Sequence, residues 1–135
     1  MSRAFKNGLS TEGPVEVQDQ EVSRPKFKDY ALTVNARGSI SGAQTIDYSL
    51  GNYVTATASG AIQWTVTNPP ATGIAGGFIL KLTNGGAGAQ TWMSGIKWPG
   101  GVAPTLVASG VDILVFTTDD AGTTWRGVLS QADSK

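Results

Sequence analysis

The chain has 135 residues, of which 40% are hydrophobic, with ten basic and ten acidic side chains and no histidine or cysteine. This length suits one domain with a core of ordinary size, and the balanced charge provides no overall field that would attract nucleic acid. Disulfides, thiolate chemistry and imidazole-dependent triads are excluded. The first residues lack the apolar core of a secretory signal, and no run of about 18 apolar residues occurs, so we expect neither export by that route nor a membrane span.

Charge is concentrated at the N-terminal end, where residues 1–29 hold ten of the twenty charged side chains. The apolar residues of this segment keep neither a helical nor a sustained strand period, and two prolines interrupt any helix. We expect residues 1–28 to form an extended arm and residues 29–135 to form a β-sandwich domain. A solvated tail is the alternative, but it would not need spaced apolar anchors. The expected anchors, which would bind a partner, are Phe5, Leu9, Val15, Val17, Val22 and Phe27.

From Tyr30 onward, short alternating segments separated by glycine-rich turns predict an all-β fold, an antiparallel jelly-roll-like β-sandwich with little helix. Residues 44–50, 52–58 and 61–67 alternate apolar and polar side chains, and the Ser59-Gly60 pair predicts a hairpin turn between the second and third segments. Asn68–Gly73 contains two prolines that end strand pairing. Residues 77–83 and 111–118 are denser apolar runs, which we expect to be central strands.

Two glycine-containing turns, residues 84–92 and 119–125, each follow an apolar strand and end in Thr-Trp, so we expect two β-hairpins. Thr118–Trp125 fits the Asp-box pattern, a hairpin-stabilising element that propellers repeat several times. One copy argues against a propeller and predicts a structural role for Asp120, Gly122 and Trp125. A calcium site at the adjacent Asp119 and Asp120 is the alternative, although further oxygen ligands at calcium-loop spacing are missing.

No catalytic, metal or cofactor site is expected. Glutamate occurs only in the predicted arm, and the five aspartates beyond residue 29 are interpreted as solvent-facing strand or turn residues rather than as a glycosidase pair. The glycine pairs precede no lysine in P-loop register and are read as turns. The four tryptophans are interpreted as core volume, with a sugar-stacking platform as the alternative.

The stretch Gly95–Leu106, GIKWPGGVAPTL, belongs to a longer combination of motifs that includes the Gly-Thr-Thr-Trp hairpin. Over about Lys28 to Lys135 this combination resembles a β-domain of tailed-bacteriophage virion proteins, often of the tail-fibre or minor structural type. Its most specific element is a shaped corner with an aromatic anchor, formed by Trp98, Pro99, Gly100 and Gly101.

The resemblance implies a virion structural protein made in the host cytoplasm. Because the domain stands here with only a short arm, we expect a capsid cement or decoration protein on the capsid surface. Its partners would be itself, as a homotrimer, and the major capsid protein. One alternative is a small tail, neck or tail-fibre protein whose partners are tail proteins, and another is a carbohydrate-binding module. No enzyme activity, nucleic-acid partner or membrane partner is expected.

Overall fold

The computed structural model describes residues 17, 18 and 20–135, and these described residues are all-β, with 47% in strands and 8% in helical turns. The contacts divide the chain between Tyr30 and Ala31, and the residues from Ala31 to Lys135 form the β-domain. The expected lack of long helices is confirmed, since the helical residues form three short 3-10 turns. The strands are β1 (Val34–Asp47), β2 (Tyr53–Thr67), β3 (Gly76–Thr83), β4 (Gln90–Thr91), β5 (Ile96–Lys97), β6 (Val111–Thr118) and β7 (Trp125–Gln131), and the 3-10 turns are η1 (Tyr48–Leu50), η2 (Gly85–Ala87) and η3 (Pro99–Gly101).

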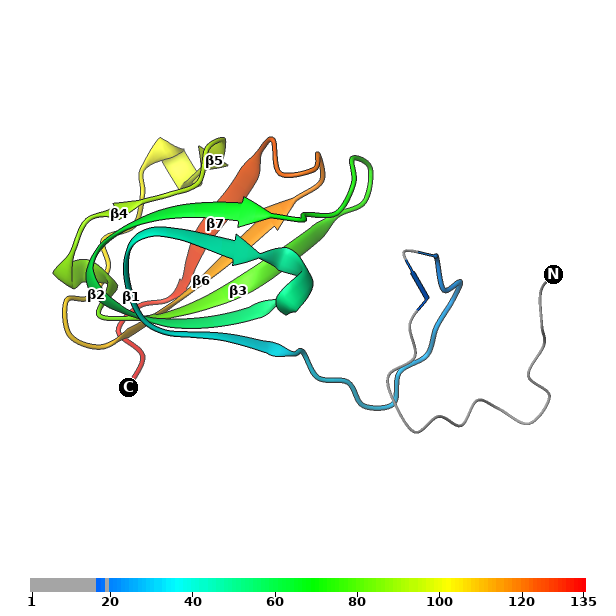
Figure 1. The fold of residues 1–135 in the computed structure, drawn as a ribbon, viewed down its shortest axis with the longest axis horizontal. Coiled ribbons are helices and arrows are strands. Elements are labelled where there is room, and N and C mark those ends of the chain that lie inside the picture. The colour runs from blue at the N-terminus through cyan, green and yellow to red at the C-terminus, as the bar shows by residue number, and fades with distance from the viewer. Residues whose placement is uncertain (1–16, 19) are drawn as a thin grey trace. The chain divides into compact units, whose positions relative to one another are not determined.

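The first two strands, β1 and β2, curve around the β-domain like two turns of a coil, and we call each turn a circuit. β1 and β2 pair in parallel, with Val34 beside Tyr53 and Asp47 beside Thr67. Parallel neighbours usually need a long crossover, yet only residues 48–52 connect these two strands. The 14 residues of β1 would span about 45 Å if straight, whereas the five-residue link reaches back about 20 Å at most. β1 must therefore curve back on itself, as Figure 1 shows, and β2 repeats the same curve beside it.

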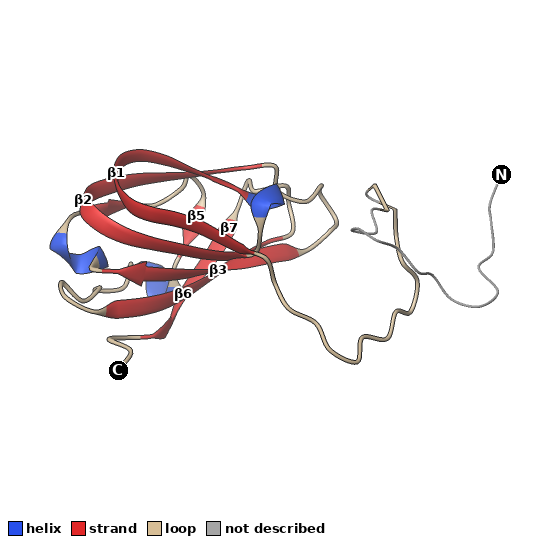
Figure 2. Cartoon of the chain, turned by 60° about the horizontal axis from the view of Figure 1, so that its bottom comes forward, coloured by secondary structure: helices blue, strands red, loops and turns tan. Residues whose placement is uncertain are grey.

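The curvature of β1 has a local cause at two glycines. Gly38 and Gly42 have φ values of 71° and 72°, in the left-handed region that glycine adopts readily, and the register against β2 shifts beside both. β2 passes through Ser59 and Gly60 without ending. The predicted hairpin turn at Ser59-Gly60 is therefore wrong: the chain bends there within one strand. Figures 1 and 2 show the bent strands passing from one layer of the β-domain to the other.

The link from β1 to β2 begins with η1, which is capped by Asp47. The carboxylate oxygen Oδ1 of Asp47 accepts the backbone N–H of Ser49 at 3.0 Å, its hydroxyl at 2.7 Å and the side-chain amide of Asn68 at 3.0 Å. The hydrogen bond from Asn68, followed by those from Ser49, lowers the pKa of Asp47 below its ordinary value of 3.8. The cap thus fixes the turn that starts the second circuit of the coil.

The remaining strands complete one mixed seven-stranded sheet in the order β1-β2-β3-β6-β7-β5, with β4 beside β2. β3 pairs with β2 in parallel and with β6 in antiparallel register, and β6 and β7 form an antiparallel hairpin. The predicted central strands and the hairpin over residues 119–125 are confirmed. Residues 84–92 do not form the predicted hairpin, because after η2 the chain runs on to β4, which pairs in parallel with β2.

The core lies between the two layers and consists of 14 buried apolar residues. The expectation of a purely antiparallel sheet is wrong, since β1, β2, β3 and β4 pair in parallel, and β5 also pairs in parallel with β7. Period-two alternation reports which side chains face inward and is the same for both strand directions, so the sequence pattern could not separate them. The jelly-roll connectivity is not confirmed.

Candidate functional site

The four tryptophans lie in and against the core rather than on a platform. Trp64 stacks on Trp92 at 6.2 Å and 8°, and Trp98 meets Trp92 edge-on at 5.4 Å. Trp125 packs edge-on against Phe78 at 5.5 Å. The indole N–H of Trp64 donates to the Gln90 side chain, and none of the four rings is among the exposed large hydrophobic residues. The interpretation of tryptophan as core volume is confirmed for Trp64 and Trp125, whereas Trp92 and Trp98 are half-buried and pack against the core.

The predicted corner follows β5 and is anchored by Trp98. η3 begins at Pro99, and the N–H of Gly101 donates to the Trp98 carbonyl at 2.9 Å. The Trp98 ring packs on Phe116 at 5.7 Å and lies over Gly127, where an added Cβ would approach the ring to 2.7 Å. Gly100 lies in the middle of η3 with a left-handed conformation. The ring holds the corner against the β6–β7 hairpin.

The hairpin between β6 and β7 is held by Thr118 and Asp120. The Thr118 hydroxyl donates to Asp120 Oδ1 at 3.0 Å and accepts the backbone N–H of Gly122 at 3.0 Å. Asp120 Oδ1 also accepts the backbone N–H of Thr124 at 2.8 Å, and this bond is the main cause that lowers the pKa of Asp120 below 3.8. Trp125 is buried directly after the turn. All these bonds are internal to the turn, which gives Asp120 a structural part.

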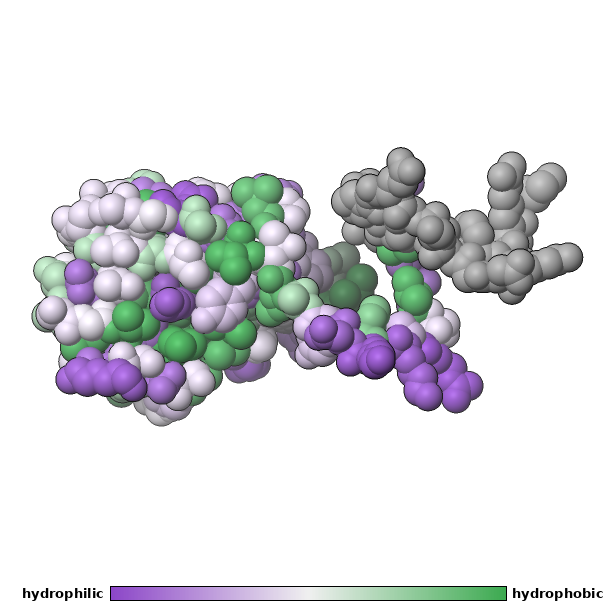
Figure 3. Space-filling model, turned by 90° about the horizontal axis from the view of Figure 1, so that it is seen from below, coloured by the Kyte–Doolittle hydropathy of each residue, from purple (hydrophilic) through white to green (hydrophobic). Residues whose placement is uncertain are grey.

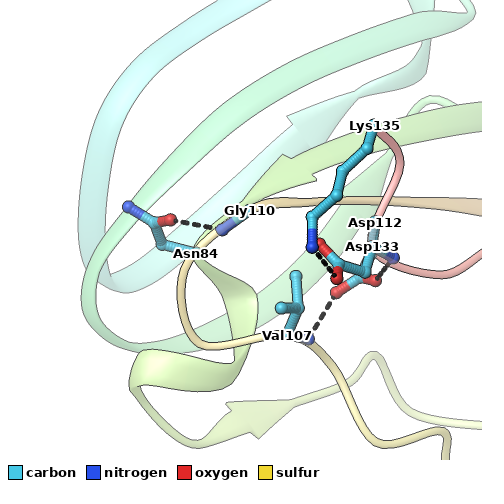
Figure 4. Close-up of polar contacts among 6 residues, drawn as sticks. All are labelled: Asn84, Val107, Gly110, Asp112, Asp133 and Lys135. Atoms are coloured by element: carbon cyan, nitrogen blue, oxygen red, sulfur yellow. Dashed lines mark hydrogen bonds and ion pairs between the residues drawn. The ribbon is translucent and has the colours of Figure 1, made fainter.

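A buried carboxylate connects the C-terminal end to the loop before β6, as Figure 4 shows. Asp112 is 1% exposed, its Oδ2 accepts the backbone N–H of Val107 at 2.7 Å, and its Oδ1 accepts that of Asp133 at 2.9 Å. Asp133 in turn forms an ion pair with Lys135 at 2.9 Å. The interpretation of Asp112 as a solvent-facing strand residue is wrong, because the return of the chain past β6 covers it. The alternation of apolar and polar residues gave no sign that Asp112 holds the C-terminal end to the loop before β6.

Two small, open hollows lie on the surface of the β-domain. One of about 150 Å³ lies beside Trp92 and Leu106, and one of about 210 Å³ lies over threonines of β2 and β3 beside Lys81. Both are smaller than the clefts of about 300–1,000 Å³ that hold small-molecule ligands. Among the described residues, no cluster of three or more metal-ligating side chains is found, and no helix is long and apolar enough to cross a membrane.

Exposed apolar side chains gather toward the start of the described chain. Phe27 and Tyr30 are 71% and 76% exposed, and their rings lie 6.3 Å apart. Six of the ten exposed large hydrophobic residues lie within residues 17–34, and they are Val17, Val22, Phe27, Tyr30, Leu32 and Val34. On the β-domain, Figure 3 shows hydrophobic residues interrupted by polar ones on the face in view. We call the six residues the apolar row.

The expected arm anchors are therefore placed only in part. Val17, Val22 and Phe27 are exposed members of the apolar row, whereas Phe5, Leu9 and Val15 lie outside the described residues. Sequence reasoning did not name Tyr30, Leu32 and Val34 as exposed residues, because they follow the charged segment and fall inside the expected domain, residues 29–135. Comparisons with protein-family models, curated proteins and solved structures find no match to this chain.

Proposed function

We propose that this chain is a structural protein of a bacteriophage virion, a capsid cement or decoration protein that assembles as a homotrimer and uses its N-terminal arm to hold its neighbours. The resemblance of its β-domain motifs to virion proteins supports the virion part of the proposal. The apolar row is the observation that carries the assembly part, because 18 residues hold six of the ten exposed large hydrophobics in the described chain.

Burial of the apolar row would be favourable. A fully buried large apolar side chain contributes about 1.5–3 kcal/mol by leaving water, while ordering the arm costs about 1–2 kcal/mol per residue. Burial of the row against a complementary surface on a neighbour would therefore offset part of this ordering cost.

Two alternatives differ in location and partner. A tail, neck or fibre protein would use the same arm to attach to tail proteins. A carbohydrate-binding module of the expected kind would use a platform of exposed tryptophans, whereas the tryptophans here pack on one another, on Phe78 and on Phe116. The aromatic packing thus favours an assembly role over sugar binding.

The decisive measurement is the number of copies of this chain per purified particle, relative to the major capsid protein, by quantitative mass spectrometry. A cement protein is present in a copy number comparable to that of the capsid protein, and a tail protein in a few copies. Absence from particles would refute the virion proposal.

The part played by the apolar row is tested with a double variant, Val22→Ser with Phe27→Ser, in particle-binding assays. We expect loss of stable binding with the β-domain still folded. Val102→Ser is the matched control, because Val102 is 73% exposed but lies on the corner, away from the row in sequence. Equal binding by both variants would refute a role for the row.

A further inference from the structure

β1 lies at the edge of the sheet. Along its 14 residues it pairs with β2, and within the described part of the chain it pairs with no other strand. An edge of this length presents a row of backbone N–H and C=O groups that can accept another strand. Proline, which commonly blocks such edges, is missing from β1, and its only charged residues are Arg37 and Asp47. The coil is therefore open on this side.

The sequence before β1 repeats the turn that joins the first two circuits of the coil. Paired residues of β1 and β2 are 18 to 20 positions apart. The link between these strands begins with Asp47-Tyr48-Ser49-Leu50, and 18 residues earlier the chain reads Asp29-Tyr30-Ala31-Leu32. Three of the four residues are identical at the spacing of one circuit. Residues 17–28 thus occupy the sequence positions of a further circuit that would precede β1.

The apolar residues of this segment have the spacing that an added strand needs. At offsets of 18 or 19 residues, three apolar residues fall opposite the three buried positions of β1, in the pairs Val17–Asn35, Val22–Ile40 and Phe27–Ile46. The β1–β2 pairs at the same three positions have offsets of 18 to 20. A strand added in this register would turn its apolar side chains toward the core side of the sheet.

Asn35 provides an independent sign that something pairs with β1. It is 8% exposed, and within the described residues its side-chain nitrogen has no hydrogen-bond acceptor. Elsewhere in the sheet, just before β2, Asn52 donates its side-chain amide to the Gly77 carbonyl of β3 at 2.7 Å, so an asparagine side chain can bond to the backbone of a neighbouring strand. Buried donors normally have acceptors. A strand beside β1 would bring backbone carbonyls next to Asn35.

The link that precedes β1 is poorly suited to folding the segment onto its own chain. The equivalent link, residues 48–52, contains Gly51 at φ 143°, where a Cβ would collide with the carbonyl oxygen of Thr33. Residues 30–33 are one residue shorter and contain no glycine. Short links favour exchange of an element between copies over closure within one chain.

We propose that residues 17–28 of one copy add as a parallel strand to the free edge of β1 in a second copy. Repeated around a closed ring, this exchange gives each copy one donated and one accepted strand, which suits a cyclic homotrimer. The inference deepens the self-association in the proposed function and does not require a location in the virion. It is tested on purified protein, so its failure is distinguishable from absence of the chain from particles.

The test uses the lack of cysteine in the natural chain. Glu21→Cys is introduced in one copy and Ser39→Cys in another copy that carries a larger tag, because these positions pair at the same offset of 18 and both are exposed. The copies are mixed at about 0.1 mM and treated with a short bis-maleimide. We expect crosslinked heterodimers at about ten times the control yield, since paired residues in one complex have millimolar effective concentrations. The control replaces Ser39→Cys with Ser130→Cys, an exposed serine on β7.

Equal yields for the two mixtures would overturn the proposal. A double variant carries Glu21→Cys and Ser39→Cys in one chain. If, on dilution, this variant forms crosslinks only within single chains, the proposal is also overturned. A second variant tests the short, glycine-free link by changing Thr33→Gly and inserting Asn after it, which copies the Gly51-Asn52 sequence. We expect this change to shift crosslinking of the double variant from between copies to within one chain. Crosslinking that remains only between copies would refute the argument from the link.

Discussion

Removal of the Asp112 carboxylate tests how the C-terminal end is held to the β-domain. The buried carboxylate accepts two backbone N–H groups, from Val107 and Asp133. A hydrogen bond to a charged group contributes about 1.5–3 kcal/mol, so Asp112→Ala should lower the free energy of unfolding by about 3–6 kcal/mol. Asp112→Asn keeps one acceptor oxygen and turns an amide donor toward the other N–H, so its loss should be about half as large.

The assay is urea unfolding followed by tryptophan fluorescence, together with amide hydrogen exchange. At about 4–8 °C per kcal/mol for a domain of this size, the alanine variant should melt at least about 12 °C lower than the parent. Amides of Val107 and Asp133 should exchange faster than those of β3. Asp119→Asn is the control, because it also removes one negative charge but at an exposed position. It should change the free energy of unfolding by no more than about 0.5 kcal/mol. If Asp112→Ala lowers the free energy of unfolding by less than about 1 kcal/mol, the carboxylate of Asp112 does not hold the C-terminal end as argued.

Three further outcomes are expected. The pKa of the Asp120 carboxyl in an NMR pH titration should lie below 3.8, because the backbone N–H of Thr124 favours its charged form. The stability that this carboxylate contributes is then present above its unfolded pKa and is lost as pH falls through the lowered folded pKa. A pKa above 3.8 would contradict this. Trp98→Ala should lower the free energy of unfolding by about 2–3 kcal/mol and change the near-ultraviolet circular dichroism, while Val102→Ala changes neither measurably. Deletion of residues 1–28 should leave the circular dichroism of the β-domain unchanged, because every core residue lies at position 40 or later; loss of the β spectrum would show that the arm supports the core.

The sequence by itself determined the features that depend on near neighbours. Period-two alternation identified the two halves of β2 as strand and the buried face that carries Trp64, and dense apolar runs identified β3 and β6 as central strands. The Asp120 turn could be predicted because its hydrogen bonds connect residues two to four positions apart. Local chemistry of this kind is the same whatever the rest of the chain does.

The tertiary structure alone decided strand direction and the path of the coil. The first ten residues of β1 were not predicted as a strand. They contain Gly38 and Gly42, which in the fold bend a strand that β2 keeps paired on one side. Asp112 was misread because its partners lie 5 and 21 residues away and approach it only when the loop and the C-terminal end return to β6. Alternation states which way a side chain faces on its own strand, but the burial of that face depends on segments far along the chain, which no local pattern contains.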